Sequence, residues 1–166
     1  MSTELERLRT RPQETELPGG IGTVRFIAQC AGDADSVLDI TKQTLALALQ
    51  LSEVSNFDEA TWAESLPKRF IANSPPFPSL DELAAYNSLP LEVRIDRERT
   101  EGWPLRAFIN VFRPDYDFRG WLWWDAAILD ENHLVVAVEV EGWPFPWQSL
   151  RWLFRGAGAV ELEPEP

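Results

Sequence analysis

Tryptophan is concentrated in the last third of this chain, and this concentration most constrains what the chain can fold into. Seven of the eight tryptophans lie between Trp103 and Trp152, and the tetrapeptide Glu101-Gly102-Trp103-Pro104 recurs as Glu141-Gly142-Trp143-Pro144. An indole is large, stiff and amphipathic, so such a set either fills a core made of a sheet and helices or forms a surface for a partner. The sequence is compatible with both.

The length of 166 residues suits a single domain. We expect a flexible N-terminal tail over residues 1–18, one α+β domain over residues 19–160 and a flexible acidic tail over residues 161–166. No apolar run approaches the roughly 20 residues that a membrane span needs. Residues 1–20 lack the apolar region of a secretory signal, and the single cysteine cannot form an internal disulfide. These features indicate a cytoplasmic protein.

The chain is strongly acidic, with a net charge of −12 from 27 acidic and 15 basic residues. Phosphate backbones would repel such a chain, so we expect no nucleic-acid partner and no membrane partner. Many proteins carry this much negative charge for solubility alone, and that explanation is enough for any single acidic residue. The same charge would attract a basic protein.

The N-terminal half reads as one strand followed by helices. Residues 23–30 are rich in β-branched and aromatic side chains and have the length of a strand. Asp33 to Ser36 offer acceptors for the free amides of a helix start, and no glycine or proline follows until Ser52. Besides this long helix over residues 35–52, we expect short helices ending near Ser65, opening at Pro67, and running over residues 80–86.

After Pro90 the apolar pattern changes from helical to alternating. Leu91, Val93 and Ile95 alternate with charged residues, as in a strand with one buried face. The sequence thus predicts strands over residues 91–96, 105–112, 120–129 and 133–141, then a helix over residues 147–155 with Arg151 and Arg155 facing water. Val160 and Leu162 fit an additional edge strand. The predicted fold is α+β, a mainly antiparallel sheet of four to six strands covered by the long N-terminal helix and the C-terminal helix.

The repeated Glu-Gly-Trp-Pro has two interpretations. Gly-Trp-Pro is a good way to end a strand, because glycine tolerates unusual dihedral angles and proline cannot continue a ladder. We favour this structural interpretation. If two strand ends lie together, Trp103 and Trp143 instead form an aromatic ledge flanked by Glu101 and Glu141, which would suit a basic partner.

Other acidic and aromatic residues extend this candidate surface. Trp123 and Trp124 are adjacent on a strand and must point to opposite sides of the sheet, so both cannot lie in one core. Residues 101–166 carry an acidic bias. The full candidate partner surface is Glu101, Trp103, Asp115, Asp117, Trp124, Asp125, Glu139, Glu141 and Trp143.

We find no set of residues that predicts catalysis. His133 is the only histidine, which excludes a histidine-rich metal site, and it is expected on the surface after a turn. Cys30 shares a strand face with apolar residues and reads as a small inward-facing hydrophobe rather than a nucleophile. Asp115 and Asp117 lack the spacing of a calcium loop. We therefore predict no enzyme activity, no catalytic residues, no metal and no cofactor.

The leading hypothesis is a non-enzymatic acidic binding or inhibitory protein, of the type with which bacteria neutralise a basic protein toxin. Carboxylates would speed the encounter and one or more indoles would supply the desolvated contact. Two alternatives stay open. The chain is either a small-molecule or peptide-binding domain with a tryptophan-lined pocket, or a structural protein whose aromatic face pairs with itself. The sequence does not specify the oligomeric state.

Overall fold

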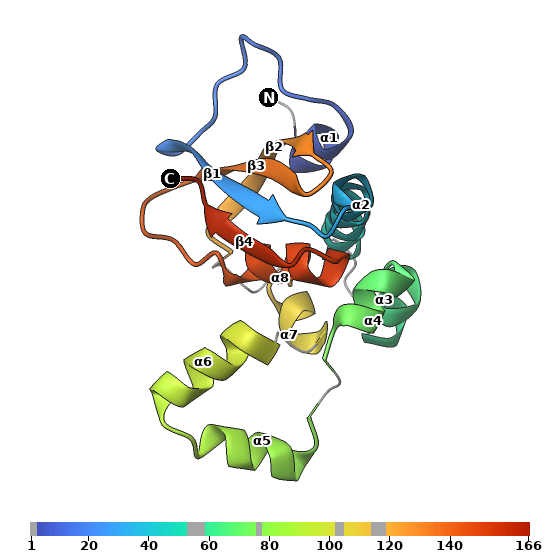
Figure 1. Ribbon diagram of the computed structural model, residues 1–166, viewed down its shortest axis with the longest axis vertical. Coiled ribbons are helices and arrows are strands. Elements are labelled where there is room, and N and C mark those ends of the chain that lie inside the picture. Colours follow the sequence, from blue (N-terminus) through green and yellow to red (C-terminus); the bar gives the residue numbers. More distant parts are fainter. Residues whose placement is uncertain (1–2, 53–58, 76–77, 102–104, 114–118) are drawn as a thin grey trace.

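The fold is an antiparallel sheet with helices packed on it, seen in a computed structural model that describes residues 3–52, 59–75, 78–101, 105–113 and 119–166 (Figure 1). The strands are β1 Gly22–Gln29, β2 Trp121–Asp130, β3 His133–Val140 and β4 Glu161–Pro164. The helices are α1 Glu4–Arg9, α2 Ala34–Ser52, α3 Glu59–Ser65, α4 Lys68–Asn73, α5 Leu80–Asn87, α6 Leu91–Glu101, α7 Leu105–Asn110 and α8 Gln148–Ala157. The predicted α+β class and antiparallel sheet are confirmed.

The four strands pair in the order β2-β3-β1-β4, and every pair is antiparallel. Residues directly opposite one another share a face of the sheet, and Phe26 lies opposite Val136 while Leu162 lies opposite Ala28. These residues are all buried. One face of the sheet therefore forms the core, as the alternation along β1 and β3 predicts.

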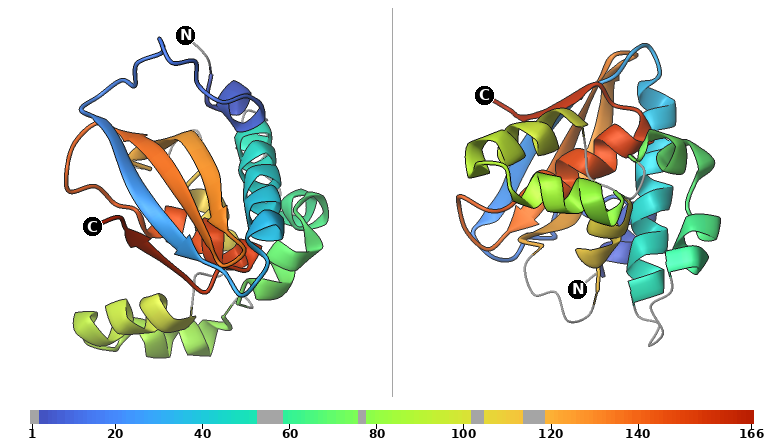
Figure 2. Two further views of the ribbon diagram at one scale, coloured as in Figure 1. Left: turned by 45° about the horizontal axis from the view of Figure 1, so that its top comes forward. Right: turned by 90° about the horizontal axis from the view of Figure 1, so that it is seen from below.

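Helix α8 is the centre of the helical layer. It contacts α2, α4 and β4, so it lies between the sheet and the other helices (Figure 2). Phe154 stacks on Trp123 at 6.4 Å between ring centroids, and Trp121 donates a hydrogen bond from Nε1 to Ser149 Oγ at 2.9 Å. Almost every residue of α8 is buried as a result. Arg151 is buried too, against Trp147, so the prediction that it faces water is wrong.

Strand β4 occupies the segment for which the sequence suggests an acidic tail. Its Leu162 is fully buried opposite Ala28 of β1, and Glu165 N donates a further hydrogen bond to Arg25 O. One apolar side chain between glutamates is enough to attach a short strand when the neighbouring strand has a free edge. The expected edge strand around Leu162 is therefore present.

The first predicted strand after Pro90 is wrong, because residues 91–101 form helix α6. The Arg94 amide donates to Pro90 O, and proline at a helix start has its φ angle already set. The segment is rich in leucine, glutamate and arginine, and Arg94 and Glu98 are spaced as neighbours on a helix. Without a strand beside it, the alternating pattern has nothing to pair with.

The second predicted strand is also wrong, because residues 105–110 form helix α7. Phe108 and Ile109 are adjacent and both fully buried, which a strand with one wet face does not allow. Apolar residues at 105, 108, 109 and 112 follow the helical spacing of three and four residues. This helical spacing decides the secondary structure of the segment.

The first residues also differ from the expected tail. Thr3 and Glu6 form a reciprocal capping box that starts helix α1, with Thr3 N to Glu6 Oε2 at 2.6 Å. Leu8 is buried in the core, and α1 lies against β2 and against α2 (Figure 2). The N-terminal segment is thus part of the packed domain.

The contact between α8 and α4 leaves no space at Gly156. A Cβ atom there would lie 2.2 Å from Cε2 of the buried Phe70. We predict that Gly156→Ala lowers the free energy of unfolding by about 1–3 kcal/mol, because overpacking outweighs the gain in helix propensity. Urea unfolding measures it. Gly142→Ala is the matched control, since nothing lies within 4 Å of its added Cβ, and equal stability of the two variants would contradict the packing described.

Candidate functional site

The N-terminal segment covers one edge of the sheet with a carboxylate. Glu4 Oε1 accepts a hydrogen bond of 2.6 Å from the backbone amide of Trp123 in β2, and its Oε2 accepts one of 2.5 Å from Arg119. β2 is an edge strand. Its pairing with β3 is irregular at Trp124, the residue that follows Trp123. A side-chain carboxylate therefore takes the place of a neighbouring strand at this point, which protects an edge that otherwise invites pairing.

Arg7 on α1 occupies the aromatic and acidic surface that the sequence predicts around Trp124. Its guanidinium carbon lies 4.3 Å from the centroid of the Trp124 ring, within the range of a cation–π interaction. Its nitrogens lie 3.4 Å from Glu139 Oε2 and 3.3 Å from Glu16 Oε1. The Arg7 side chain is almost completely buried. Both ion pairs of Arg7 therefore lie inside the protein, where dissolved salt weakens them little.

Arg11 neutralises the next acidic residue of the candidate surface. Its Nε and Nη2 both bind the Asp125 carboxylate, with the shortest distance 2.7 Å from Nη2 to Oδ2. This bidentate hydrogen bonding, followed by the carboxylate's charge, raises the pKa of Arg11. Arginines of the same chain thus already bind three residues of the candidate surface, Trp124, Asp125 and Glu139.

Trp143 is the predicted residue that stands out from the surface. Its side chain is 57% exposed, and its ring makes a T-shaped contact with Phe145 at 5.6 Å. Phe145 in turn contacts the fully buried Phe26 at 6.2 Å. The exposed indole is therefore supported by aromatic rings that lead into the core. Glu141 is also exposed and makes no ion pair with any residue in the described part of the chain.

The remaining candidate residues are not described. Trp103, Asp115, Asp117 and the side chain of Glu101 lie outside the described residues. The backbone of Glu101 ends helix α6, whereas Glu141 follows strand β3. The two copies of Glu-Gly-Trp-Pro therefore follow different kinds of element, so the expectation that both end strands is wrong.

Possible metal ligands are not grouped in the described part of the chain. Among them, no three histidine, cysteine, aspartate or glutamate side chains are placed to hold a metal ion. His133 is partly exposed, and its Nδ1 lies 3.0 Å from Asp130 Oδ1. Cys30 is buried, and burial, followed by the nearby Asp33, raises the pKa of its thiol to about 11. A thiol of this pKa is a poor nucleophile at neutral pH.

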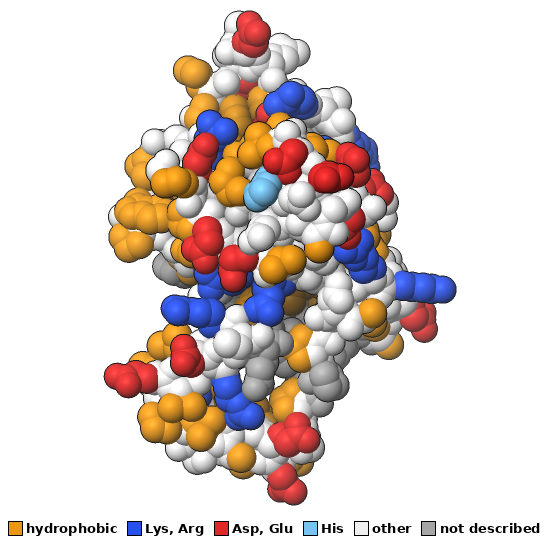
Figure 3. All heavy atoms as spheres, viewed as in Figure 1, with side chains coloured by type: hydrophobic (Ala, Val, Ile, Leu, Met, Phe, Trp, Pro, Cys, Tyr) orange, Lys and Arg blue, Asp and Glu red, His pale blue; other side chains and the backbone are white. Residues whose placement is uncertain are grey.

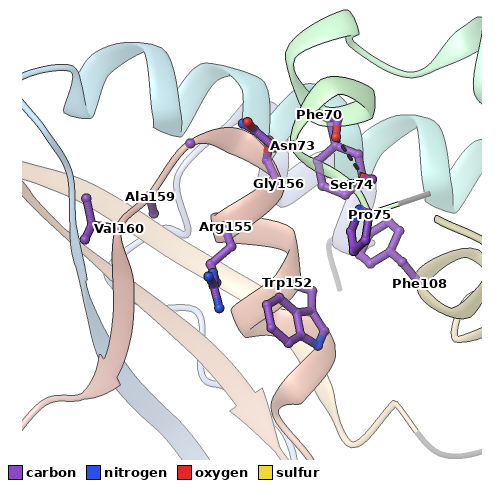
Figure 4. Close-up of a pocket in the computed structure, with 11 residues that line it drawn as sticks. Phe70, Asn73, Ser74, Pro75, Phe108, Trp152, Arg155, Gly156, Ala159 and Val160 are labelled. Carbon is purple, nitrogen blue, oxygen red and sulfur yellow. Dashed lines mark hydrogen bonds between the residues drawn. The ribbon is translucent and has the colours of Figure 1, made fainter. Parts of the chain in front are cut away.

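A small pocket lies between α4, α7, α8 and the start of β4 (Figure 4). Its volume is about 250 Å³, and its lining includes Phe70, Ser74, Phe108, Trp152, Arg155 and Val160. Arg155, which the sequence predicts to face water, is half-buried. Its guanidinium lies over Trp152 and donates hydrogen bonds of 2.7 and 3.1 Å to the carbonyls of Arg99 and Thr100. One of the residues that line the pocket is therefore an arginine that already has partners.

Comparison with models of known protein families finds no match, and neither does comparison with curated proteins or with solved structures. Within the described residues, no helix is both long and apolar enough to cross a membrane. Function must therefore be argued from the geometry alone.

Sequence reasoning missed Arg7 and Arg11, which alter the candidate surface most. The signal was the alternation of acidic residues and arginines from Glu4 to Glu16, together with the helical pair Leu5 and Leu8. A helix that buries one leucine brings its neighbouring arginine down to the sheet. Nothing in the local sequence identifies which distant acidic residues that arginine meets.

We predict that Arg7 and Arg11 differ sharply in their effect on stability. Arg7→Ala should lower the free energy of unfolding by about 3 kcal/mol, because it leaves Glu139 and Glu16 partly buried without a cation. Arg11→Ala should leave it nearly unchanged, since its ion pair is exposed to solvent. Urea unfolding at neutral pH measures both. Equal losses in the two variants would mean that the Arg7 cluster is not an internal ion pair.

Fluorescence quenching tests the exposure of Trp143 directly. Acrylamide, which is neutral and therefore insensitive to Glu141, should quench the wild type more than Trp143→Phe. Trp152→Phe is the control, because Trp152 is buried and its removal should take away only emission that acrylamide does not quench, so that the quenched intensity stays the same. Identical quenching of the wild type and Trp143→Phe would show that this indole is shielded.

Proposed function

We propose that this chain is a non-enzymatic binding or inhibitory protein of the immunity type, which neutralises a basic protein toxin in the cytoplasm. One observation carries the proposal: Trp143 is an exposed indole supported by core aromatic rings, close in the chain to a carboxylate, Glu141, that makes no ion pair with the described residues. A rigid aromatic side chain of this kind loses little conformational entropy on binding and is typical of interface hot spots.

The Arg7 cluster supports the chemistry of this proposal. In that cluster an arginine lies over an indole while two carboxylates accept its charge. Trp143 and Glu141 offer the same two components, an aromatic face and an anion, without the arginine. An arginine from a basic partner would complete the arrangement, and the net charge of −12 would speed the encounter.

The proposed surface is smaller than the one predicted from sequence. Asp125, Glu139 and Trp124 are engaged by arginines of the N-terminal segment, so within the described residues the proposal rests on Glu141 and Trp143. A small-molecule site is less well supported, because the pocket of about 250 Å³ is below the range of roughly 300–1,000 Å³ that ligand pockets usually occupy.

Native co-purification tests the proposal. The wild-type protein, isolated at low salt from its own host, should carry a stoichiometric basic protein, identified by mass spectrometry and then expressed for calorimetry. Trp143→Ala should weaken binding of that protein by about 30-fold or more, equivalent to a loss of about 2 kcal/mol at a hot spot. Glu141→Gln should weaken binding and reduce its dependence on salt.

Val160→Ala is the matched control, because Val160 is an exposed aliphatic residue away from the 141–147 loop. It should bind like the wild type. Recovery of the protein alone at low salt, or equal affinity of Trp143→Ala and Val160→Ala for the partner, would contradict the proposal.

A further inference from the structure

Three consecutive residues at the edge of β2, positions 123–125, are each held by one side chain of the N-terminal segment, residues 3–16. Glu4 binds the backbone amide of the first, Arg7 lies over the ring of the second and Arg11 binds the carboxylate of the third. The N-terminal segment therefore occupies part of the surface that the sequence assigns to a partner.

The chemistry of this occupant shows what the surface beneath it can bind. Residues 7–11 carry three arginines and no acidic residue, in a chain whose net charge is −12. Arg7 lies between an indole face and two carboxylates, and Arg11 contacts its carboxylate through two nitrogens. Both geometries suit a planar guanidinium better than an ammonium group. Figure 3 shows basic and acidic side chains next to one another over the upper part of the molecule, where Figure 1 places the N-terminal segment.

A buried arginine is a costly way to close a sheet edge. Arg7 Nε and Arg119 Nη1 are buried and have no hydrogen-bond partner in the described part of the chain. Apolar side chains of similar volume would cover the edge without this electrostatic cost. Recognition of arginine therefore explains the residues of the N-terminal segment better than protection of the edge alone.

The N-terminal segment is attached through few apolar contacts. Helix α1 has 6 residues, too few for a stable isolated helix, and Leu8 is its buried apolar residue. After α1 the chain loops away from the sheet before it enters β1 (Figure 1). Leu17 in this loop is 80% exposed. Segments with few buried contacts open locally while the rest of a domain stays folded, so this segment can leave the sheet without global unfolding.

The covered surface continues into the proposed partner surface. Glu139, a carboxylate under the N-terminal segment, comes two residues before Glu141 and four before Trp143. The loop that follows the segment meets the same place, because Ile21 N donates a hydrogen bond of 3.0 Å to Val140 O. A partner bound at Trp143 therefore lies next to the N-terminal segment.

We propose that the N-terminal segment is an internal competitor for the basic partner. In the free protein its arginines occupy Trp124, Asp125 and Glu139, and an arginine-bearing segment of the partner displaces them to bind the same surface. The inference takes the nature of the partner from the proposed function, whereas the site itself follows from the geometry. An internal competitor favours well-matched basic proteins over others, because every ligand must first displace it.

A synthetic peptide of residues 3–16 tests the covered surface from outside the chain. The opened variant is the full chain with Leu8→Ala and Arg11→Gln, which weakens the hold of its own segment and leaves the residues beneath unchanged. It should bind the peptide about tenfold or more tighter than the wild type does, measured by calorimetry. The same peptide with Arg7→Gln and Arg11→Gln should bind the opened variant about tenfold or more weaker.

The matched control is the full chain with Leu17→Ala and Arg9→Gln, the same two kinds of substitution at exposed positions of the same region. It should bind the peptide as weakly as the wild type. No binding to the opened variant at millimolar peptide, equal binding to the opened variant and the control, or equal binding of the two peptides overturns the proposal.

Hydrogen exchange, followed by NMR, tests whether the N-terminal segment opens by itself. In the wild type the Trp123 amide, held by Glu4, should exchange about 100-fold or more faster than the Val136 amide in the interior strand β3. The opened variant should speed exchange at Trp123 and leave Val136 unchanged. Equal exchange at the two amides in the wild type would mean that the segment leaves only on global unfolding, which overturns the proposal.

The basic partner recovered by co-purification separates this inference from the proposed function. That partner should bind the opened variant about tenfold or more tighter than the wild type. Equal affinity for the two overturns the internal competitor and leaves the proposed function standing. Absence of any basic partner at low salt, with the peptide and exchange results as expected, contradicts the proposed function alone.

Discussion

The rest of the structure depends on the packing of one sheet face against α8. Trp123 and Phe154 stack there with an angle of 10° between their planes, and Trp121 satisfies its indole N–H through Ser149. Because α8 also contacts α2 and α4, it is buried on nearly all sides and joins segments far apart in sequence. Most of the C-terminal tryptophans that the structure describes are used in this layer, so only Trp143 is left well exposed.

Closing the β2 edge determines how much of the acidic surface is available. Glu4 accepts from the Trp123 amide, and the same short helix brings Arg7 onto Trp124 and Glu139. Helix α1 therefore protects the edge strand and at the same time neutralises nearby carboxylates. The carboxylates of Glu139, Glu16 and Asp125 are consequently already paired within the chain and are less available to a partner.

Sequence alone predicts the strands and helices whose apolar pattern agrees with the face that they bury. β1 and β3 alternate because one face is buried, and α2 has an uninterrupted helical stripe. Prediction failed where the alternation of apolar residues suggested a strand but the fold offers no neighbouring strand. Leu91, Val93 and Ile95 alternate like a strand, but no strand lies beside them to pair with, so the helix-forming residues of α6 decide the outcome. The contact of Arg7 with Glu139 spans 132 residues, and no local pattern reports such a contact.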